Sequence, residues 1–210
     1  MLELDDKPVG KGQERTCYVH PDDPNKAVKV LHGDKRKQTL REIACYRELE
    51  ARRSPVSFSH LPRFYGWTST NKGEAIVVDL VRDYDGSISK SLKQLLYDGH
   101  SIEEFTPQLR DLKRYFLDNR VVFNNDMSRQ NLLFQKVAPG LARLVIVDGI
   151  GDHVRIKTLN AIPFLVRHKI RRRWERFERK MSLAAAQIAD ERRSAGVADT
   201  CFEPAFTTPD

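Results

Sequence analysis

The order of apolar and polar residues predicts four strands and one helix in the first eighty residues. β-prone runs at 16–19 and 27–31 flank a turn rich in Pro, Asp and Asn, which predicts two strands. Apolar runs at 61–67 and 75–81 surround an Asn-Lys-Gly turn and predict two more. Between these pairs, 38–52 suits a helix because its apolar residues recur at helical intervals, namely Leu40, Ile43, Ala44 and Leu49. The expected order is therefore β-β-α-β-β.

The pattern becomes mainly helical after a polar junction at 83–87. Helices are expected at 91–97 and 103–119, and the second carries apolar residues at helical spacing, namely Leu109, Leu112, Tyr115 and Phe116. Two short apolar strands follow near 132–134 and 144–147, and residues from 150 onward are expected to be largely helical. Strands first and helices after predict a two-lobed α+β protein. The expected domains are a β-rich lobe at 1–82, a reduced helical lobe at 83–199 and an irregular tail at 200–210.

Composition and charge narrow the class of protein. Charged residues make up 31% and hydrophobic ones 40% of the 210 residues, which is typical of a globular chain. No apolar run reaches the roughly 18 residues of a membrane span, and the acidic start lacks a signal peptide. Three scattered cysteines form no CxxC motif, so a cytoplasmic protein without a disulfide framework is expected. The net charge of +7 favours anionic partners, although solvated charged faces explain it equally well.

The most informative stretch contains an Asp, an Asn five residues later and a second Asp after two strands. Asp126 precedes Asn131, the two apolar strands follow, and the second strand ends at Asp148-Gly149. In this order a protein-kinase-like active site places the carboxylate that accepts a hydroxyl proton and two magnesium ligands. Each Asp taken alone is also typical of a turn or a helix cap. The complete order of groups favours a protein-kinase-like fold that binds ATP and Mg²⁺.

The first lobe contains candidates for the phosphate end of that site. Gly10 and Gly12 lie between expected strands, where glycine lets backbone N–H groups approach phosphate. Lys29 lies in an apolar strand, and Glu42 on the following helix is its best partner, with Glu48 second. A surface lysine on a strand edge is the alternative. Arg15 stands where kinases have a third loop glycine, and it either reaches a phosphate or is solvated.

The sequence also departs from a regulated protein kinase. Asn124-Asn125-Asp126 replaces His-Arg-Asp, Ser128 replaces a common lysine, and Asp148-Gly149-Ile150 replaces Asp-Phe-Gly. Only 61 residues follow Gly149, too few for a protein-substrate platform of normal size. These departures indicate a small-molecule kinase or a nucleotide-binding pseudokinase.

A strongly basic segment at 167–180 is the other candidate functional feature of the sequence. Its apolar residues recur at helical intervals, namely Ile170, Trp174, Phe177 and Met181, so the basic residues line the remaining faces. A helix docked on the second lobe is the favoured interpretation. Basic helices of this kind also bind nucleic acid or an anionic membrane surface, and these partners stay open. The six histidines show no metal-binding spacing.

The chain resembles the YrbL family, bacterial proteins named for the PhoP regulatory network. The resemblance covers about residues 8–180 and rests on several strings, namely Pro8-Val9-Gly10-Lys11-Gly12, Arg15-Thr16-Cys17-Tyr18-Val19-His20-Pro21, Leu61-Pro62-Arg63-Phe64-Tyr65-Gly66, Asp83-Tyr84-Asp85-Gly86, Leu112-Lys113-Arg114-Tyr115-Phe116-Leu117-Asp118-Asn119, Gln130-Asn131-Leu132-Leu133 and Asp148-Gly149-Ile150-Gly151. It implies a kinase-like fold without a settled activity, in a bacterial cytoplasm, within an envelope-stress or divalent-cation response. Some members have Leu-Lys-Pro-Gln-Asn in the catalytic loop, where this chain has Asp126.

The sequence therefore predicts an ATP- and Mg²⁺-binding protein with the nucleotide between two lobes. Lys29 is expected on the phosphates, Glu42 on Lys29, Asn131 and Asp148 on Mg²⁺, and Asp126 on the hydroxyl of an acceptor whose identity the residues leave open. Two interpretations remain. One is a phosphotransferase acting on a small-molecule or envelope-related acceptor, and the other is a pseudokinase that serves as a regulatory or binding module.

Overall fold

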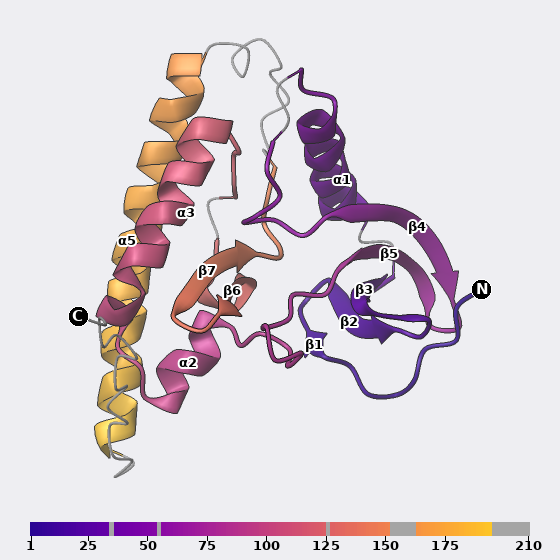
Figure 1. Cartoon of the computed structure of the whole chain (residues 1–210), viewed down its shortest axis with the longest axis horizontal. Helices are drawn as coiled ribbons and strands as arrows, with labels where there is room; N and C mark the ends of the chain where they lie inside the picture. Colours follow the sequence, from indigo (N-terminus) through magenta and orange to yellow (C-terminus); the bar gives the residue numbers. More distant parts are fainter. Residues whose placement is uncertain (34–35, 54–55, 125–126, 152–162, 195–210) are drawn as a thin grey trace. The chain divides into compact units, whose positions relative to one another are not determined.

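The computed structural model describes residues 1–33, 36–53, 56–124, 127–151 and 163–194. The chain forms two compact units, Met1–Arg82 and Asp83–Asp210 (Figure 1). The first contains an antiparallel sheet with one helix, and the second is mainly helical with a two-stranded hairpin. The α+β class predicted from the sequence is therefore confirmed.

The sheet of the N-terminal unit has five antiparallel strands in the order β1-β2-β3-β5-β4. Its strands are β1 (Gly10–Lys11), β2 (Arg15–His20), β3 (Asp23–Leu31), β4 (Phe64–Thr70) and β5 (Gly73–Asp79). β3 is central, because Lys29 pairs with Cys17 on one side and with Ile76 on the other. β4 begins at Phe64 and not at residue 61 as predicted, and Pro62, which has no N–H to donate to a ladder, precedes it.

The two faces of this sheet are packed by different segments, as the period-two alternation of side chains requires. One face carries a cluster made of Leu4, Val28, Val30 and Ala75. The N-terminal residues reach this face because Leu4 N–H donates to Asn71 Oδ1 at 2.9 Å, and Asn71 Nδ2 donates to the Leu4 carbonyl at 3.1 Å. The opposite face packs against a helix through Ala27, Ile43, Ile76 and Val78.

That helix, α1 (Arg36–Glu50), buries two of the four apolar residues of its predicted stripe, Ile43 and Leu49. The sequence predicted a stripe that includes Leu40 and Ala44, but Leu40 is 53% exposed and Ala44 is also exposed. The buried residues are Thr39, Glu42, Ile43, Tyr46 and Leu49. The helix is thus turned so that a carboxylate, Glu42, lies in the middle of its buried face.

The C-terminal unit begins with two helices whose ends match the local sequence. α2 (Leu92–Asp98) starts with a capping box, in which Ser91 accepts a hydrogen bond from Gln94 N–H and the Gln94 side chain accepts one from Ser91 N–H. It ends at Gly99, whose φ of 113° suits glycine. A short 3₁₀ turn at Ile102–Phe105 leads into α3 (Thr106–Asn119), which has Pro107 in its first turn, where a missing N–H costs nothing.

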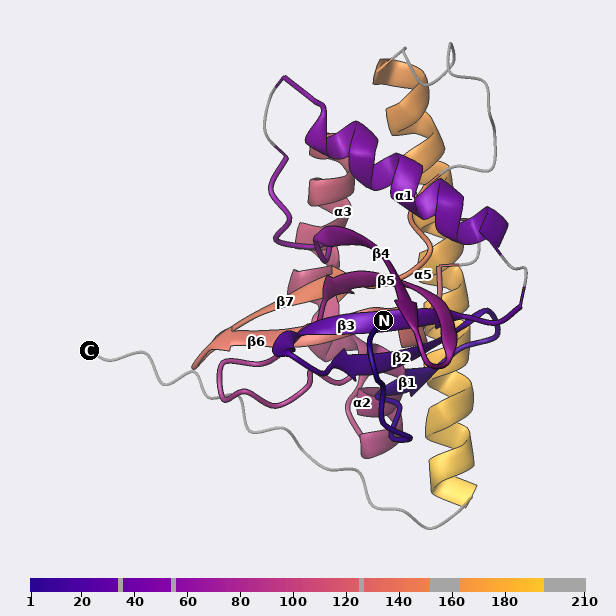
Figure 2. The ribbon, with the colours of Figure 1, turned by 90° about the vertical axis from the view of Figure 1, so that its right-hand side faces the viewer.

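A long helix, α5 (Pro163–Ser194), lies beside α3 in this unit (Figures 1 and 2). Its predicted stripe is confirmed, because the four apolar residues of that stripe are all buried. Trp174 is fully buried and packs edge-on against Phe116 and Phe123, with ring centroids 6.0 and 6.1 Å away. The predicted tail at 200–210 lies outside the described residues. Among the helices that the structure describes, none combines the length and apolar character that a membrane span requires.

The strands β6 (Leu132–Ala138) and β7 (Leu141–Ile146) form an antiparallel hairpin in the same unit. The junction segment that starts at Asp83 is tied to β6, because Lys136 N–H donates to Asp83 Oδ1 at 3.0 Å and Tyr84 N–H donates to the Lys136 carbonyl at 2.8 Å. Further along, Phe134 N–H donates to the Lys90 carbonyl at 2.9 Å. The hairpin and this segment therefore form one hydrogen-bonded framework.

The packing of Trp174 generates a stability prediction. Trp174→Ala removes a buried aromatic side chain and leaves a cavity, which costs about 3–5 kcal/mol in comparable cores. We expect the free energy of unfolding of the C-terminal unit to fall by about that amount in urea titrations followed by far-UV circular dichroism. Leu183→Ala on the same helix is the matched control, because Leu183 is 68% exposed. Equal losses in the two variants would contradict the packing described here.

Candidate functional site

Lys29 and Glu42, which the sequence paired, lie together in the N-terminal unit. Lys29 projects from the central strand β3 and Glu42 from the buried face of α1, and Lys29 Nζ is 3.4 Å from Glu42 Oε1. The two residues are 5% and 2% exposed. Lys29 is therefore not the surface lysine of the alternative interpretation. The competing partner Glu48 is exposed and pairs with Arg52 at 2.9 Å.

Arg15 is the third member of this buried cluster. Its Nη1 atom lies 2.6 Å from Glu42 Oε2, and the residue is 5% exposed. Arg15 shares one face of the sheet with Lys29, because Cys17 pairs with Lys29 and Arg15 lies two positions before Cys17 on the same strand. The idea of a solvated Arg15 is therefore wrong. Sequence reasoning considered this residue as a phosphate ligand or as a solvated side chain, and it missed the contact with Glu42.

The hydroxyl of Tyr46 completes the surroundings of the carboxylate. It lies one helical turn after Glu42 on α1 and donates to Glu42 Oε1 at 3.5 Å, while its ring stacks on Phe64. Oε1 thus faces Lys29 and Tyr46, whereas Oε2 faces Arg15. We call Arg15, Lys29 and Glu42 the buried ion cluster.

The turn between β1 and β2 leads directly into this cluster. Gly12 N–H donates to the Arg15 carbonyl at 2.8 Å and closes the turn. His32, just after β3, lies with Nδ1 3.2 Å from the Gln13 carbonyl and Nε2 2.7 Å from Thr16 Oγ1. The turn is therefore held to the end of β3 as well as to β2.

Gly10 and Gly12, the glycines predicted to lie near the phosphates, have free space on the side where a side chain would project. A Cβ at Gly10 would have no described atom within 4 Å, and one at Gly12 would meet only the Arg15 carbonyl at 3.5 Å. The fold of this unit therefore does not itself exclude a side chain at either position. That open backbone is compatible with the approach of an anionic group to the N–H donors.

The second set of predicted residues lies in the C-terminal unit. Leu132 pairs with Ile146, so Asn131 and Val147 lie opposite each other at the end of the hairpin. Val147 N–H donates to the Asn131 carbonyl at 2.9 Å. Asp148 comes next, and its Oδ1 accepts a hydrogen bond from Gly149 N–H at 2.7 Å. The structure thus brings Asn131 and Asp148 to the same end of the hairpin, each half-buried.

The loop that leads to Asp126 is paired with the chain after Asp148. Asn124 N–H donates to the Gly149 carbonyl at 2.7 Å, and Gly151 N–H donates to the Val122 carbonyl at 2.8 Å. Asp126 itself lies outside the described residues, so its assigned role stays a prediction. Asn124, two residues before it, is held by the first of these hydrogen bonds, and Met127, directly after it, is buried.

Sequence reasoning also missed a buried arginine of the C-terminal unit, Arg173, which contacts the segment before Asn124. Arg173 lies on the buried face of α5, is 7% exposed and donates through Nη1 to the carbonyl of Phe123. α5 is therefore attached to the backbone at Phe123 by a charged hydrogen bond, as well as by the packing of Trp174 on the Phe123 ring. The only signal in the sequence is that Arg173 falls within the apolar stripe of that helix.

Asn131 and Asp148 fit a magnesium site in their chemistry. Both offer oxygen ligands, and Mg²⁺ in proteins is commonly held by one or two carboxylates together with the phosphates of a nucleotide. Among the described residues, no group of three or more His, Cys, Asp or Glu residues forms a metal site by itself. Any ion held at Asn131 and Asp148 would therefore need further ligands, such as phosphate oxygens or water.

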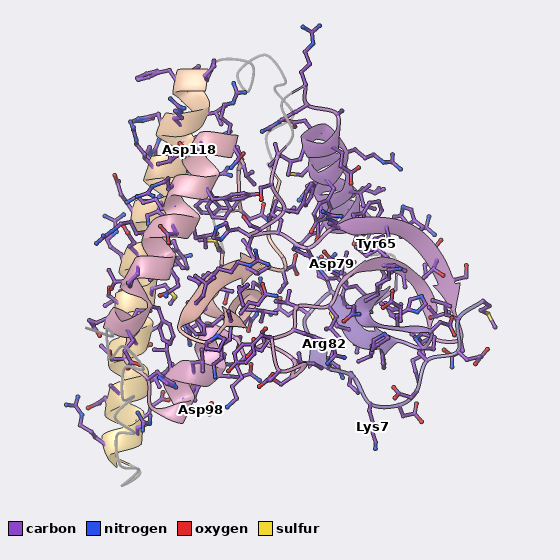
Figure 3. All side chains as sticks on the ribbon, in the orientation of Figure 1. Lys7, Tyr65, Asp79, Arg82, Asp98 and Asp118 are labelled. Atoms are coloured by element: carbon purple, nitrogen blue, oxygen red, sulfur yellow. The ribbon has the colours of Figure 1, made fainter. Side chains whose placement is uncertain are left out.

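Other titratable groups of the N-terminal unit have structural surroundings. Burial raises the pKa of the Cys45 thiol on α1 to about 12, so this thiol stays protonated and unreactive near neutral pH. The hydroxyl of Tyr65 donates to Asp79 at 2.7 Å, and this hydrogen bond raises the pKa of Tyr65 (both labelled in Figure 3). The hydrogen bond between Tyr65 and Asp79 connects β4 to β5.

The fold and the site define a mixed α+β protein with a buried ion cluster in one unit and with Asn131 and Asp148 at one end of a hairpin in the other. The chain belongs to the family described as PhoP regulatory network protein YrbL, whose model matches residues 2–182. It is 31% identical over 200 residues to "Uncharacterized protein YrbL" of Escherichia coli strain K12, and equally to the protein of that name from Shigella flexneri. Each alignment covers 90% of this chain and 92% of the relative.

The buried ion cluster generates a second stability prediction. Glu42→Gln removes the only negative charge of the cluster, and leaving buried cations without their carboxylate costs about 3–5 kcal/mol. We expect urea unfolding, followed by the fluorescence of Trp67 in the same unit, to show a loss of that size.

Glu48→Gln is the matched control for this prediction, because it makes the same chemical change on an exposed position of the same helix. Its effect on the free energy of unfolding should stay within about 0.5 kcal/mol. If Glu42→Gln were as mild as Glu48→Gln, the carboxylate would not hold the cluster together.

Proposed function

We propose that the chain is an ATP- and Mg²⁺-binding protein of kinase-like fold, and that it transfers phosphate to a small-molecule or envelope-related acceptor in the bacterial cytoplasm. The observation that carries the proposal is the buried ion pair between Lys29 on the central strand and Glu42 on α1. In kinases a strand lysine and a helix glutamate form this pair, which holds the lysine at the nucleotide phosphates.

The energetics of buried charges support a functional role for this pair. Replacing a buried ion pair by well-packed apolar residues is often neutral or stabilising, so such a pair is weak evidence for a purely structural role. The buried ion cluster places three charged side chains in the core of a small unit. Two of the three are cations, which suits a site for a phosphate-bearing ligand.

The proposal assigns one task to each predicted residue. Lys29 binds phosphate oxygens, and Glu42 orients Lys29. The backbone N–H groups near Gly10 and Gly12 approach the phosphates, as in other glycine-containing phosphate loops.

The residues of the C-terminal unit complete the assignment. Asn131 and Asp148 hold Mg²⁺, which neutralises charge on the phosphates when it is bound. Asp126 orients the acceptor hydroxyl and accepts its proton. Arg173 supports the Asp126 loop through the Phe123 carbonyl.

The family description places the protein in the PhoP regulatory network, and we extend this context to the chain as part of the proposal. A pseudokinase that acts as a regulatory module in that network is the alternative. The phosphotransferase and the pseudokinase differ in activity, because only the phosphotransferase turns over a substrate and its turnover requires Asp126.

Magnesium and ATP together should stabilise the protein. A ligand at about 100 times its dissociation constant adds roughly 2.7 kcal/mol to the free energy of unfolding. For a chain of this size that amounts to a rise of about 5–11 °C in the unfolding midpoint, measured by differential scanning fluorimetry. Asp148→Ala should abolish the magnesium-dependent part of the rise, because it removes a proposed ligand.

Two variants control this experiment. Asp118→Ala removes an exposed carboxylate on α3 and should leave the rise intact (Asp118 is labelled in Figure 3). Asp126→Asn should also keep it, since that residue is assigned to the acceptor and not to the nucleotide. The absence of any rise at millimolar ATP would contradict the proposal and favour the pseudokinase.

The exposed side of α5 supports a second candidate function, a module that binds nucleic acid. Arg171, Arg172, Arg176 and Arg179 are exposed, and none forms an ion pair with another residue that the structure describes. Arginine suits phosphate recognition because its planar guanidinium donates two parallel hydrogen bonds. The apolar stripe of this helix is buried in its own unit, and these four arginines lie outside that stripe on exposed positions.

This candidate predicts a steep dependence of binding on salt. If three arginines contact phosphates, the logarithm of the affinity for a duplex DNA should fall with the logarithm of salt at a slope of about −3. Fluorescence anisotropy with a labelled 20-base-pair duplex, from 50 to 200 mM KCl, measures the slope. Replacing Arg172, Arg176 and Arg179 by alanine should flatten it.

A charge-matched control separates this surface from the general positive charge of the protein. Replacing Lys7, Arg63 and Arg110 by alanine removes the same three charges from exposed positions elsewhere. The slope of this control should match that of the wild type. A wild-type affinity that does not change with salt would exclude the nucleic-acid module.

A further inference from the structure

Arg15 connects the glycine-containing turn to the buried ion cluster. It is the first residue of β2, and its carbonyl accepts the hydrogen bond from Gly12 N–H that closes the turn. Its backbone pairs with Leu31 at the end of β3, and its side chain reaches Glu42 on α1. A single residue therefore links the turn, two strands and the helix.

The two cations of the cluster, Arg15 and Lys29, lie at different distances from the carboxylate oxygens of Glu42. Arg15 Nη1 lies 2.6 Å from Oε2, whereas Lys29 Nζ lies 3.4 Å from Oε1. Because the attraction between opposite charges weakens with distance, the ion pair with Arg15 is the stronger Coulombic contact of the two. Arg15 is thus the close partner of the carboxylate, and Lys29 is the looser one.

The chemistry of the two side chains suits this division. The guanidinium of Arg15 is planar, always charged and well matched to a carboxylate. The ammonium of Lys29 is a compact charge on a flexible stem, with three donors that can turn toward another anion. The closer arginine satisfies much of the charge of Glu42, so Lys29 can turn toward a phosphate at a lower electrostatic cost.

We infer that Arg15 is a positioning residue of the nucleotide site. It holds Glu42 and thereby leaves the ammonium of Lys29 able to bind the phosphates, while it fixes the glycine turn against α1. This inference rests on the proposed ATP-binding function and assigns a residue that acts through Glu42 and Lys29, without a contact of its own to the nucleotide.

The inference predicts a selective loss of phosphate binding when Arg15 is neutralised. In Arg15→Met, Glu42 becomes a partner of Lys29 alone, and the pair is close to neutral. We expect the affinity for Mg-ATP, measured by isothermal titration calorimetry, to fall about tenfold. The affinity for adenosine, which has no phosphate, should change less than twofold.

A double variant distinguishes positioning from direct contact. Because Arg15 acts through Lys29, Arg15→Met combined with Lys29→Met should bind Mg-ATP no more weakly than Lys29→Met alone. If the two losses multiply instead, Arg15 contacts the phosphates independently of Lys29, and the positioning role is wrong.

Matched variants control for the loss of charge and for folding. Arg36→Met makes the same change at an exposed arginine of α1, and Lys26→Met does so for a partly exposed lysine of β3, and both should keep the wild-type affinity. Arg15→Lys keeps the charge and should bind Mg-ATP within about threefold of the wild type. Arg15→Gln replaces Arg15→Met in all comparisons if the latter does not fold, as judged by circular dichroism.

The outcomes separate this inference from the function on which it rests. A wild-type protein that binds no Mg-ATP overturns the proposed function and the role of Arg15 together. Wild-type binding with an unchanged affinity in Arg15→Met overturns the role of Arg15 alone. Equal losses for ATP and adenosine also overturn it, because they indicate general damage to the unit.

Discussion

The burial of Glu42 is the constraint on which the N-terminal unit depends. A carboxylate that is 2% exposed needs cations beside it, and Lys29 and Arg15 supply them from neighbouring strands. Glu42 lies on the buried face of α1 together with Ile43, Tyr46 and Leu49, whereas Leu40 is exposed. A single carboxylate thus has partners on two strands and connects the helix to the turn.

The C-terminal unit depends on a comparable anchor with different chemistry. Here an aromatic cluster around Trp174 and the buried Arg173 attach α5 to the segment that ends at Asn124. Asn124 N–H donates to the Gly149 carbonyl, so this segment is also held to the residue that follows Asp148. In this unit α5 does more than cover a core, because it also supports the loop to which the proposal assigns the acceptor chemistry.

Much of the local structure could be predicted from the sequence, and the failures have identifiable causes. Most strands and helices followed from apolar periodicity, although the two-residue strand β1 was not predicted, and the Lys29–Glu42 pair followed from an inward-facing strand lysine that needs a partner. The start of β4 was missed because the apolar run at 61–67 includes Pro62. The buried face of α1 was predicted only in part, because it also contains Thr39 and Glu42, and periodicity follows apolar residues alone.

The sequence by itself determined the order of the elements and which residue types accompany each of them, because both depend on neighbours within a few positions. The tertiary structure alone decided that Arg15 is closer than Lys29 to Glu42, and that Arg173 reaches the Phe123 carbonyl, 50 residues away. Such contacts join distant segments, and no local pattern specifies which of several charged side chains will be close enough to meet. Packing makes that choice, because only a few rotations of a helix bury its apolar side chains and pair its charges at once.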